Sequence, residues 1–443
     1  MKRMTSNEIR KVFLDFFVSK DHRIIKSSSL VPSDDPTLLI VNSGMAPLKK
    51  YFTGEESPPY PRLCNIQKCV RINDIEDVGN RYHLTFFEMM GNWSIGDYFK
   101  EKAINLAWEL LIDTFGFNAS KIYVTVYGGD KKLPGVPSDK ETVKIWKEVG
   151  LPLERIILLG AKVNFWGPTS NTGPCGPCTE VFIDRGEKYG CGEKECGPGC
   201  KSNRFLEIWN AGVFMQYYLH KDKSLTGLPL KNVDAGAGLD RFAVVTQNVD
   251  SVYETDLLNP IIKIFTSNSN LDIESKSLRI ITDHIRCATF MIADNIFPGN
   301  TKREYVVRRI LRRALLHANI VGLDRELFLK AIDTVVKLFS RYYPELESNC
   351  NVVKSVVEKE SMAFNRTLNR SLRQFNKILT YSQETISGKD AFKLSDTYGL
   401  PFELTKELAK EKGLKVNEEG YKLYLEEQRK RSREKQMFKK GDF

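Results

Sequence analysis

The sequence predicts an α+β fold in which an antiparallel sheet flanked by helices is followed by an all-helical domain. In residues 1–250, short β-prone runs are separated by Gly, Pro and Asn rather than by regular helices, which favours antiparallel over parallel pairing. After residue 250, long segments with helical spacing replace them. We therefore expect one domain at 1–250 and a second at 251–443, with the polar run TSNSN as a linker in the boundary region 245–275.

The first domain mixes helical and strand signals. Helical spacing occurs in residues 5–20 and 100–115. The β-prone runs are residues 37–42, 121–127, 180–184 and 207–218. The stretch 167–202 is rich in Gly, Pro and Cys, and we expect it to be a loop.

The second domain reads as helices throughout. Helical patterns cover residues 277–297, 303–322, 326–343 and 355–379. The highly charged tail at 428–443 predicts a helix end that frays.

Composition limits the class of protein. The chain has 443 residues, of which 42% are hydrophobic, and it has no apolar run of about 18 residues that could cross a membrane. The N-terminal segment mixes charged and apolar residues, which indicates an amphipathic helix rather than a signal peptide. Nine cysteines, an odd number, favour reduced thiols and a cytoplasmic location.

Positive charge gathers in the second half of the chain. Residues 1–250 carry 32 Lys and Arg against 30 Asp and Glu, whereas residues 251–443 carry 34 against 26. This imbalance suggests a polyanionic partner for the second domain, although basic helices also serve solubility alone.

Four arginines crowd one face of the helix expected at 303–322. Arg308, Arg309, Arg312 and Arg313 fall within an arc of about 140° at 100° per residue. Such guanidiniums repel each other unless phosphates or carboxylates lie opposite them. Contact with a nucleic-acid backbone and an ion-pair network with acids of another helix are both open.

A first candidate phosphate site lies in residues 64–100. Arg71 ends one β-prone run, and His83, Phe86 and Phe87 begin another after a polar loop, as in two antiparallel strands. An Arg that forks onto a phosphate and an aromatic ring that sandwiches a base would together hold a nucleotide. We expect one of the two phenylalanines to belong to the core instead.

A second candidate phosphate segment is NVDAGAGLDRFA at 232–243. Gly236 and Gly238 allow close approach of the backbone to a ligand, and Arg241 stands near a helix start, which favours anions. The chain has no GxxxxGK[ST] loop, no GxGxxG opening a βαβ unit and no His-x-Gly-His signature.

Together these segments resemble a known family. Arg71, His83 and Phe87, followed by a Gly-rich turn with an acid–Arg pair, resemble motifs 2 and 3 of class II aminoacyl-tRNA synthetases; residues 36–50, with Pro47, match motif 1. Strings in family order over nearly the whole chain resemble alanyl-tRNA synthetases: DPTLLIVNSGMAPLKKYF, HLTFFEMMGNWSIGDYFK, NFWGPTSNTGPCGPC, EIWNAGVFMQYY, YVVRRILRRA and SDTYGLPFELT.

The resemblance implies the class II synthetase fold and ATP-dependent activation of alanine, followed by transfer to the 3′ end of tRNA(Ala). By motif match, Arg71 would hold the α-phosphate and the alanine carboxylate, and His83 and Arg241 would face the outer phosphates. Phe87 would stack on adenine, and Asp234 would receive the alanine ammonium. Arg71, Arg241 and Asp234 are thus the expected catalytic group, and Mg²⁺ is expected with ATP without an assigned ligand.

The remaining motif positions complete both sites. Glu88, Gly236 and Gly238 are implied for the ATP site, and Trp166, Asn210 and Val213 for the pocket around the alanine side chain. In the second domain, Asn300 and Asp396 match positions that read the wobble pair of the acceptor stem, and the arginine cluster would support the RNA backbone. No oligomeric state is implied.

Three departures from the family pattern stand out. Asp240 replaces the usual Glu of motif 3, the loop after Arg71 is short and lacks a frequent lysine, and Ala211–Gly212 make the EIWN segment one residue longer.

The 443 residues contain no HxxxH pair of an editing domain, so we expect misacylation with serine without clearance. A paralogue that loads another acceptor and a catalytically impaired RNA-binding protein are the alternatives.

A cysteine-rich insert raises the question of zinc. Cys191, Cys196 and Cys200 lie close together, Ser202 stands where a fourth thiol would complete a tetrahedron, and the upstream Cys175 and Cys178 could contribute. The missing fourth thiol favours a remnant of a zinc site, or simple loop cysteines, over a bound metal.

Overall fold

Two units of different architecture make up the chain. The computed structural model describes residues 2–33, 38–133, 135–168, 172–193, 196–200 and 202–440. The chain divides into one unit at Met1–Lys263 and another at Ile264–Phe443.

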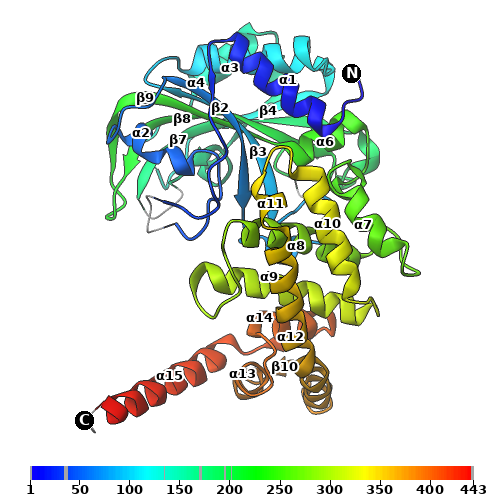
Figure 1. Ribbon diagram of the computed structural model, residues 1–443. Helices are drawn as coiled ribbons and strands as arrows, with labels where there is room; N and C mark the ends of the chain where they lie inside the picture. The colour runs from blue at the N-terminus through cyan, green and yellow to red at the C-terminus, as the bar shows by residue number, and fades with distance from the viewer. Residues whose placement is uncertain are drawn as a thin grey trace. The chain divides into compact units, whose positions relative to one another are not determined.

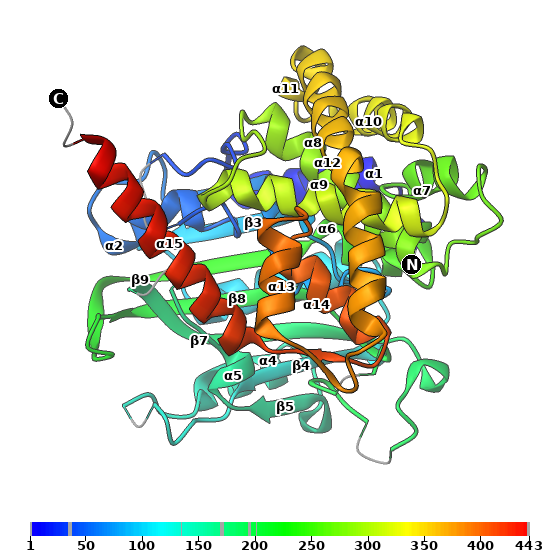
Figure 2. The same ribbon diagram turned by 90° about the horizontal axis from the view of Figure 1, so that it is seen from below.

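A sheet of nine strands, counted over the described residues, lies at the centre of the first unit (Figure 1). The strands are β1 (Arg23–Ile24), β2 (Arg62–Val70), β3 (Phe86–Ile95), β4 (Ile122–Tyr127), β5 (Ile156–Leu159), β6 (Phe165–Trp166), β7 (Gly173–Asp184), β8 (Phe205–Leu219) and β9 (Leu225–Gly238). Their order is β1-β2-β3-β9-β8-β7-β4-β5, with β6 paired to β7, and Figure 2 shows the half from β9 to β5 side by side. Among the strand pairs of this sheet in the described residues, only β1–β2 and β4–β5 are parallel, so the predicted antiparallel α+β fold is confirmed.

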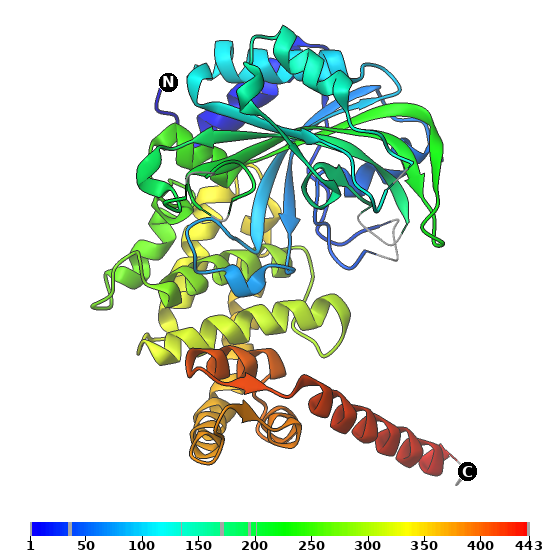
Figure 3. The ribbon, with the colours of Figure 1, turned by 180° about the vertical axis from the view of Figure 1, so that it is seen from behind.

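Helices cover one face of this sheet, as Figures 1 and 3 show. The helices of the first unit are α1 (Ser6–Ser19), α2 (Lys49–Thr53), α3 (Lys100–Glu109), α4 (Lys140–Glu148), α5 (Ala161–Asn164) and α6 (Leu239–Gln247), and α7 (Asn259–Thr266) crosses into the second. Thr5 and Glu8 form a reciprocal capping box that starts α1, whose Phe13 and Phe17 are fully buried. A π-helical turn, Leu110–Thr114, extends α3, so both helices predicted in this unit are confirmed.

The strand predicted at 37–42 is wrong over its described part, 38–42, which has no strand geometry; Pro36 and Thr37 of the motif 1 match lie outside the described residues. Val41 makes two isolated backbone bonds, from its N–H to Leu30 and from the Val70 N–H to its carbonyl. Leu38, Val41 and Ala46 instead form a small buried cluster. The apolar run therefore reflects burial without strand pairing.

The loop predicted at 167–202 is wrong for residues 173–184, which form β7 between β8 and β4. Register shifts on either side of Cys178 accommodate the prolines, which have no N–H to donate. A Cβ at Gly176 would lie 2.0 Å from the Phe214 carbonyl oxygen, so this position requires glycine. Pairing on both sides overrides the turn-like composition.

The second unit is a helical assembly. Its helices are α8 (Lys276–Ala293), α9 (Lys302–Ile320), α10 (Glu326–Phe339), α11 (Glu345–Ser348), α12 (Cys350–Leu379), α13 (Gly388–Asp396), α14 (Phe402–Glu411) and α15 (Glu418–Lys440). The four predicted helices correspond to α8, α9, α10 and α12, and the charged tail lies in α15 up to residue 440, beyond which the chain is outside the described residues. A short parallel pair, β10 (Thr385–Ile386) with β11 (Lys415–Val416), joins the segments around α13 and α14.

None of the described helices combines the length and the apolar character that a membrane crossing would need.

Candidate active site

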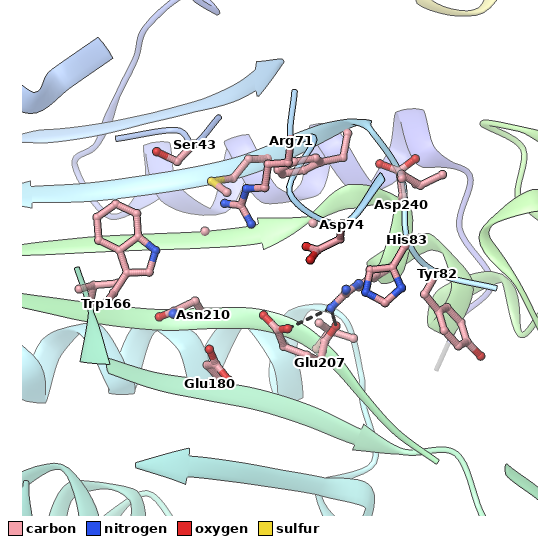
Figure 4. Close-up of a pocket in the computed structure, with 18 of the residues that line it drawn as sticks. Ser43, Arg71, Asp74, Tyr82, His83, Trp166, Glu180, Glu207, Asn210 and Asp240 are labelled. Atoms are coloured by element: carbon pink, nitrogen blue, oxygen red, sulfur yellow. Dashed lines mark hydrogen bonds and ion pairs between the residues drawn. The ribbon is translucent and has the colours of Figure 1, made fainter. Parts of the chain in front are cut away.

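A cavity of about 300 Å³ in the first unit brings together ten of the eleven residues that the sequence assigned to ATP or alanine binding (Figure 4). They are Arg71, His83, Phe87, Trp166, Asn210, Val213, Asp234, Gly236, Gly238 and Arg241. These residues come from the ends or flanks of β2, β3 and β6, from β8 and β9, and from the first turn of α6. Segments far apart in the sequence therefore line one cavity.

Strand alternation places one face of β3 and β9 on this cavity. Phe87 and Met89 line it from β3, whereas Phe86 is fully buried, so the expectation that one of the two phenylalanines belongs to the core is confirmed. On β9, Asp234, Gly236 and Gly238 line the cavity at every second position.

The glycine at position 236 serves a close approach to the neighbouring strand. Gly236 pairs with Gly91 across β3 and β9. A Cβ at Gly236 would lie 2.8 Å from the Met89 Sδ, whereas one at Gly238 would meet nothing within 4 Å. At both positions the strand therefore presents only its backbone to the cavity.

Arg71 presents its guanidinium at the centre of the cavity wall. Its Nε donates to the Asn42 carbonyl oxygen at 2.8 Å, and the guanidinium lies 4.9 Å from the ring centroid of Phe87. Over the described residues, no carboxylate forms an ion pair with it. Figure 4 shows Arg71 between Trp166 and Asn210 on one side and His83 and Tyr82 on the other.

Arg241 sits among acids and a histidine. Its Nη1 donates to Glu207 Oε2 at 2.9 Å. Burial, together with the positive charge of Arg241, lowers the pKa of His83. Burial and then the neighbouring Glu207 raise the pKa of Glu180 to about 9, so Glu180 is protonated near neutral pH.

Asp234 is a buried carboxylate on the cavity wall. Its Oδ1 accepts a hydrogen bond of 2.7 Å from the indole N–H of Trp93. Burial raises its pKa to about 6, while Trp93 and Arg71 act in the opposite direction. Near neutral pH it is therefore a mostly ionised group aimed at a space that would suit a cation.

The extra residue of the EIWN segment is absorbed by a bulge in β8. Asn210 pairs with Gly236 and Val213 pairs with Asp234, so Ala211 and Gly212 oppose a single residue of β9. Both Asn210 and Val213 consequently line the cavity.

Glu88 is the predicted ATP-site residue that the structure places elsewhere. It alternates with Phe87 and faces the helices, where its fully buried carboxylate pairs with Arg10 of α1 through two hydrogen bonds. The prediction that Glu88 lines the nucleotide site is wrong, because neighbouring residues of a strand point to opposite faces.

The α9 arginines pair with acids of neighbouring helices in the second unit. Arg308 and Arg312 share Glu360 of α12, at 3.3 and 2.8 Å from their Nε atoms. Arg313, only 3% exposed, makes two hydrogen bonds of 2.7 and 2.6 Å to Glu407 of α14. The expected row of phosphate-facing guanidiniums is therefore wrong for Arg313, and the ion-pair network that the sequence left open is present.

Of the other second-unit candidates, Asn300 and Asp396 are exposed. Asn300 accepts a hydrogen bond from Arg308, and Asp396 accepts one of 2.7 Å from Gln428. Arg309 is half-buried.

The candidate cysteines separate into two sets. Cys175 and Cys178 are buried in β7, where their thiols contact the carbonyl oxygens of Tyr217 and Val163. They do not belong to the thiol cluster that the structure forms from Cys191, Cys196 and Cys200.

Sequence reasoning missed five polar residues that line the cavity: Ser43, Asp74, Tyr82, Glu180 and Glu207. Glu207 opens the EIWN string and Tyr82 precedes His83, so both stood within recognised motifs. No motif pointed to Glu180, because its raised pKa depends on burial and on Glu207 of the neighbouring strand.

Comparison with known proteins gives consistent matches. The family model described as tRNA synthetases class II (A) matches residues 8–442. The alanine–tRNA ligase of Natranaerobius thermophilus is 44% identical over 99% of this chain and 50% of its own length. That of Thermotoga maritima is 45% identical over 98% of this chain and 50% of its own. This chain thus spans about half the length of these relatives.

Among solved structures, the apo histidyl-tRNA synthetase of S. aureus matches 54% of this chain and 66% of that chain. The sequence identity is 10% and the TM-score is 0.33, which is too low to support a structural argument.

Proposed function

Since this chain belongs to the family of class II tRNA synthetases, we propose that it activates alanine with ATP and transfers the alanyl group to the 3′ end of tRNA(Ala). The alanine carboxylate attacks the α-phosphate, a new P–O bond forms and pyrophosphate leaves. A ribose hydroxyl of the tRNA then attacks the carbonyl carbon, AMP leaves and the hydroxyl proton is released. The relatives named alanine–tRNA ligase support alanine as the amino acid.

The convergence of Arg71 and Arg241 on one cavity carries this proposal. The first step brings the negative alanine carboxylate to a negative phosphate, so it needs positive groups held on both sides of the reacting atoms. Arg71, which has no carboxylate partner among the described residues, would hold the carboxylate and the α-phosphate together. Arg241 and His83 would take the outer phosphates, and Phe87 would stack on adenine.

The opposite side of Arg71 suits a small zwitterion. Asp234 would bind the ammonium group, because an ionised carboxylate buried to 93% gains strongly from a cationic partner (its relative exposure is 7%). Trp166, Asn210 and Val213 would close the space around the methyl group. We place catalysis in the first unit on these grounds.

Magnesium is the metal that ATP chemistry implies, and the acids of the cavity fit it. Glu207 and Asp240 offer the carboxylate oxygens that Mg²⁺ prefers, whereas a protonated Glu180 is a poor ligand. When bound there, Mg²⁺ would neutralise phosphate charge. Asp240, one methylene shorter than the family's Glu, lines the same cavity and therefore keeps a carboxylate at this site.

Recognition of the tRNA acceptor stem is assigned to the second unit. Asn300 and Asp396 are exposed polar side chains on its surface and would read the wobble pair. Arg308 holds Asn300 through a side-chain hydrogen bond, so it would position the reader rather than contact phosphate directly. Nine free thiols support a cytoplasmic location.

The test has two stages. ATP–pyrophosphate exchange is measured with a panel of amino acids, and alanine should give the highest kcat/KM. Charging is then measured with tRNA(Ala) and with a tRNA whose wobble pair is replaced, which should abolish charging but leave exchange unchanged. Exchange without charging of any tRNA would favour a different acceptor, and absence of exchange would favour a catalytically impaired RNA-binding protein.

A further inference from the structure

The segment that connects β7 to β8, residues 185–204, has almost nothing apolar with which to fold. Its sequence RGEKYGCGEKECGPGCKSNR contains no Val, Leu, Ile, Met, Phe or Trp. Among its described residues, the only regular element is the 3₁₀ turn Glu187–Tyr189. Connections of this length without helices or strands of their own are uncommon in folded domains. A segment that has no hydrophobic core needs another interaction to hold one conformation.

The base of this segment is firmly closed. Asp184 accepts two hydrogen bonds of 2.8 Å from Arg204, and the Arg185 N–H donates to the Arg204 carbonyl oxygen at 2.9 Å. The Arg185 guanidinium stacks 4.1 Å from the ring centroid of Tyr189. These contacts order the two ends, whereas the cysteine-rich middle has no large apolar side chain of its own.

In that middle, three thiols converge. The sulfur atoms of Cys191, Cys196 and Cys200 all lie within 4.8 Å of one another, and those of Cys191 and Cys200 are 3.4 Å apart. The Ser202 Oγ lies 3.2 Å from the Cys196 Sγ. Thiolates at about 2.3 Å from a tetrahedral zinc ion lie about 3.8 Å from one another, so these separations suit a shared cation.

Two glycines make this convergence possible. Gly192 follows Cys191 directly with a φ of +82°, and Gly199 precedes Cys200 with a φ of +87°. A residue with a Cβ is strained at such angles, so the chain turns sharply next to two of the three thiols where only glycine does so readily.

We propose that Cys191, Cys196 and Cys200 bind one structural Zn²⁺ through their thiolates and that this ion replaces a hydrophobic core in residues 185–204. The fourth position would be taken by water or by the Ser202 hydroxyl. Each thiol releases its proton to solvent on binding. Three thiolates and one Zn²⁺ leave a net charge of −1, and the Arg204 guanidinium, which also binds Asp184, interacts electrostatically with Cys196.

The first experiment measures metal content. The full chain is purified without chelators, and the zinc-to-protein ratio is determined by elemental analysis; we expect a ratio of one. Replacement by Co²⁺ should produce the absorption of thiolate-to-cobalt charge transfer. A ratio near zero together with no such band on Co²⁺ titration would overturn the proposal, as would a Cys191–Cys200 disulfide found by mass spectrometry in the metal-free protein.

Variants identify the ligands. Cys196→Ser and Cys200→Ser should each lose the bound zinc, whereas Cys350→Ser, a half-buried thiol of the second unit, should keep it. Ser202→Cys should add a fourth thiolate and slow the release of zinc to a chelator by about tenfold or more, since even changes around a metal ligand alter affinity 10- to 100-fold. An unchanged release rate in Ser202→Cys, or equal zinc loss in Cys350→Ser, would contradict the assignment. Because Ser202→Cys keeps all three thiols, its result does not depend on a variant that loses a ligand and fails to fold.

Discussion

Arginines in the two units are used in opposite ways. Arg71 is exposed on a cavity wall and has no carboxylate partner among the described residues. Arg313 of α9 is buried and fully engaged with Glu407, and Arg308 and Arg312 share Glu360. The same type of side chain thus faces an open cavity in one unit and pairs with acids between helices in the other.

The difference shows that the role of an arginine depends on whether an acid of the folded chain pairs with it, and not on how conspicuous the arginine is in the sequence. The α9 arginines form the more conspicuous sequence cluster, yet acids from α12 and α14 account for three of the four. Arg71, which has no carboxylate partner among the described residues, is the arginine that we propose to bind an anion from outside the chain. Substitutions in each unit should separate loss of activity from loss of stability.

The largest effect is expected from Arg71→Ala. Removing a positive group aimed at developing phosphate charge should lower kcat/KM for ATP–pyrophosphate exchange by about 10²- to 10³-fold. Because the side chain is exposed, the free energy of unfolding should change by about 0.5 kcal/mol or less. Arg341→Ala, an exposed arginine of the second unit, is the matched control and should retain exchange activity. Similar losses in both variants would refute the role of Arg71.

Arg313→Met should act in the opposite manner. It leaves the carboxylate of Glu407 without its main partner in a largely buried position, which should lower the free energy of unfolding by about 3 kcal/mol. Urea denaturation of the full chain measures this. The double variant Arg313→Met/Glu407→Leu removes both charges and should recover much of the loss; if it is less stable than the single variant, buried charge is not the cause.

Asp234→Asn should lower activity and raise the free energy of unfolding. The KM for alanine should rise about 100-fold, because the ammonium loses a buried charged partner worth about 2–5 kcal/mol. The pKa of Asp234 is raised by burial to about 6, above its unfolded value of about 3.9, so ionisation in the folded state costs stability as pH rises from about 4 to 6.

The variant lacks this cost, so above pH 6 it should be more stable than the wild type by about 1–3 kcal/mol. In the wild type, the KM for alanine should rise as pH falls through about 6. A flat pH profile of this KM, or an Asn variant less stable at pH 8, would show that Asp234 is not the ionised partner.

The smallest effect is expected from Glu180→Gln. The pKa of Glu180 is about 9, so an amide imitates its protonated form at pH 7, and exchange activity should change by about twofold or less, equivalent to ±0.5 kcal/mol. Between pH of about 4.3 and 9 the unfolded chain has released the proton that folded Glu180 keeps, so the wild type should lose stability over this range and level off above pH 9, whereas the variant should not. A large loss of exchange activity at pH 7 would instead show that the reaction needs Glu180 in its ionised form.

Much of the fold could be predicted from the sequence because its signals are local. Helical spacing identified α1, α8 and α10, and the β-prone runs identified β4 and β8. The two strand errors have a common cause: pairing partners lie elsewhere in the chain. The run at 38–42 found no neighbour to pair with along its length, whereas the Gly- and Pro-rich β7 found one on each side.

The sequence by itself determined which residues are candidates for the chemistry, since motif spacing and residue type place Arg71, Asp234 and Arg241 in candidate ligand-binding segments. Only the tertiary structure decided what surrounds each charge. Glu88 pairs with Arg10 away from the cavity, and three of the α9 arginines pair with acids. The pKa values of Glu180 and Asp234 are raised. These outcomes depend on groups brought close from distant parts of the chain, and electrostatic energy is set by distance and burial, which a linear sequence does not specify.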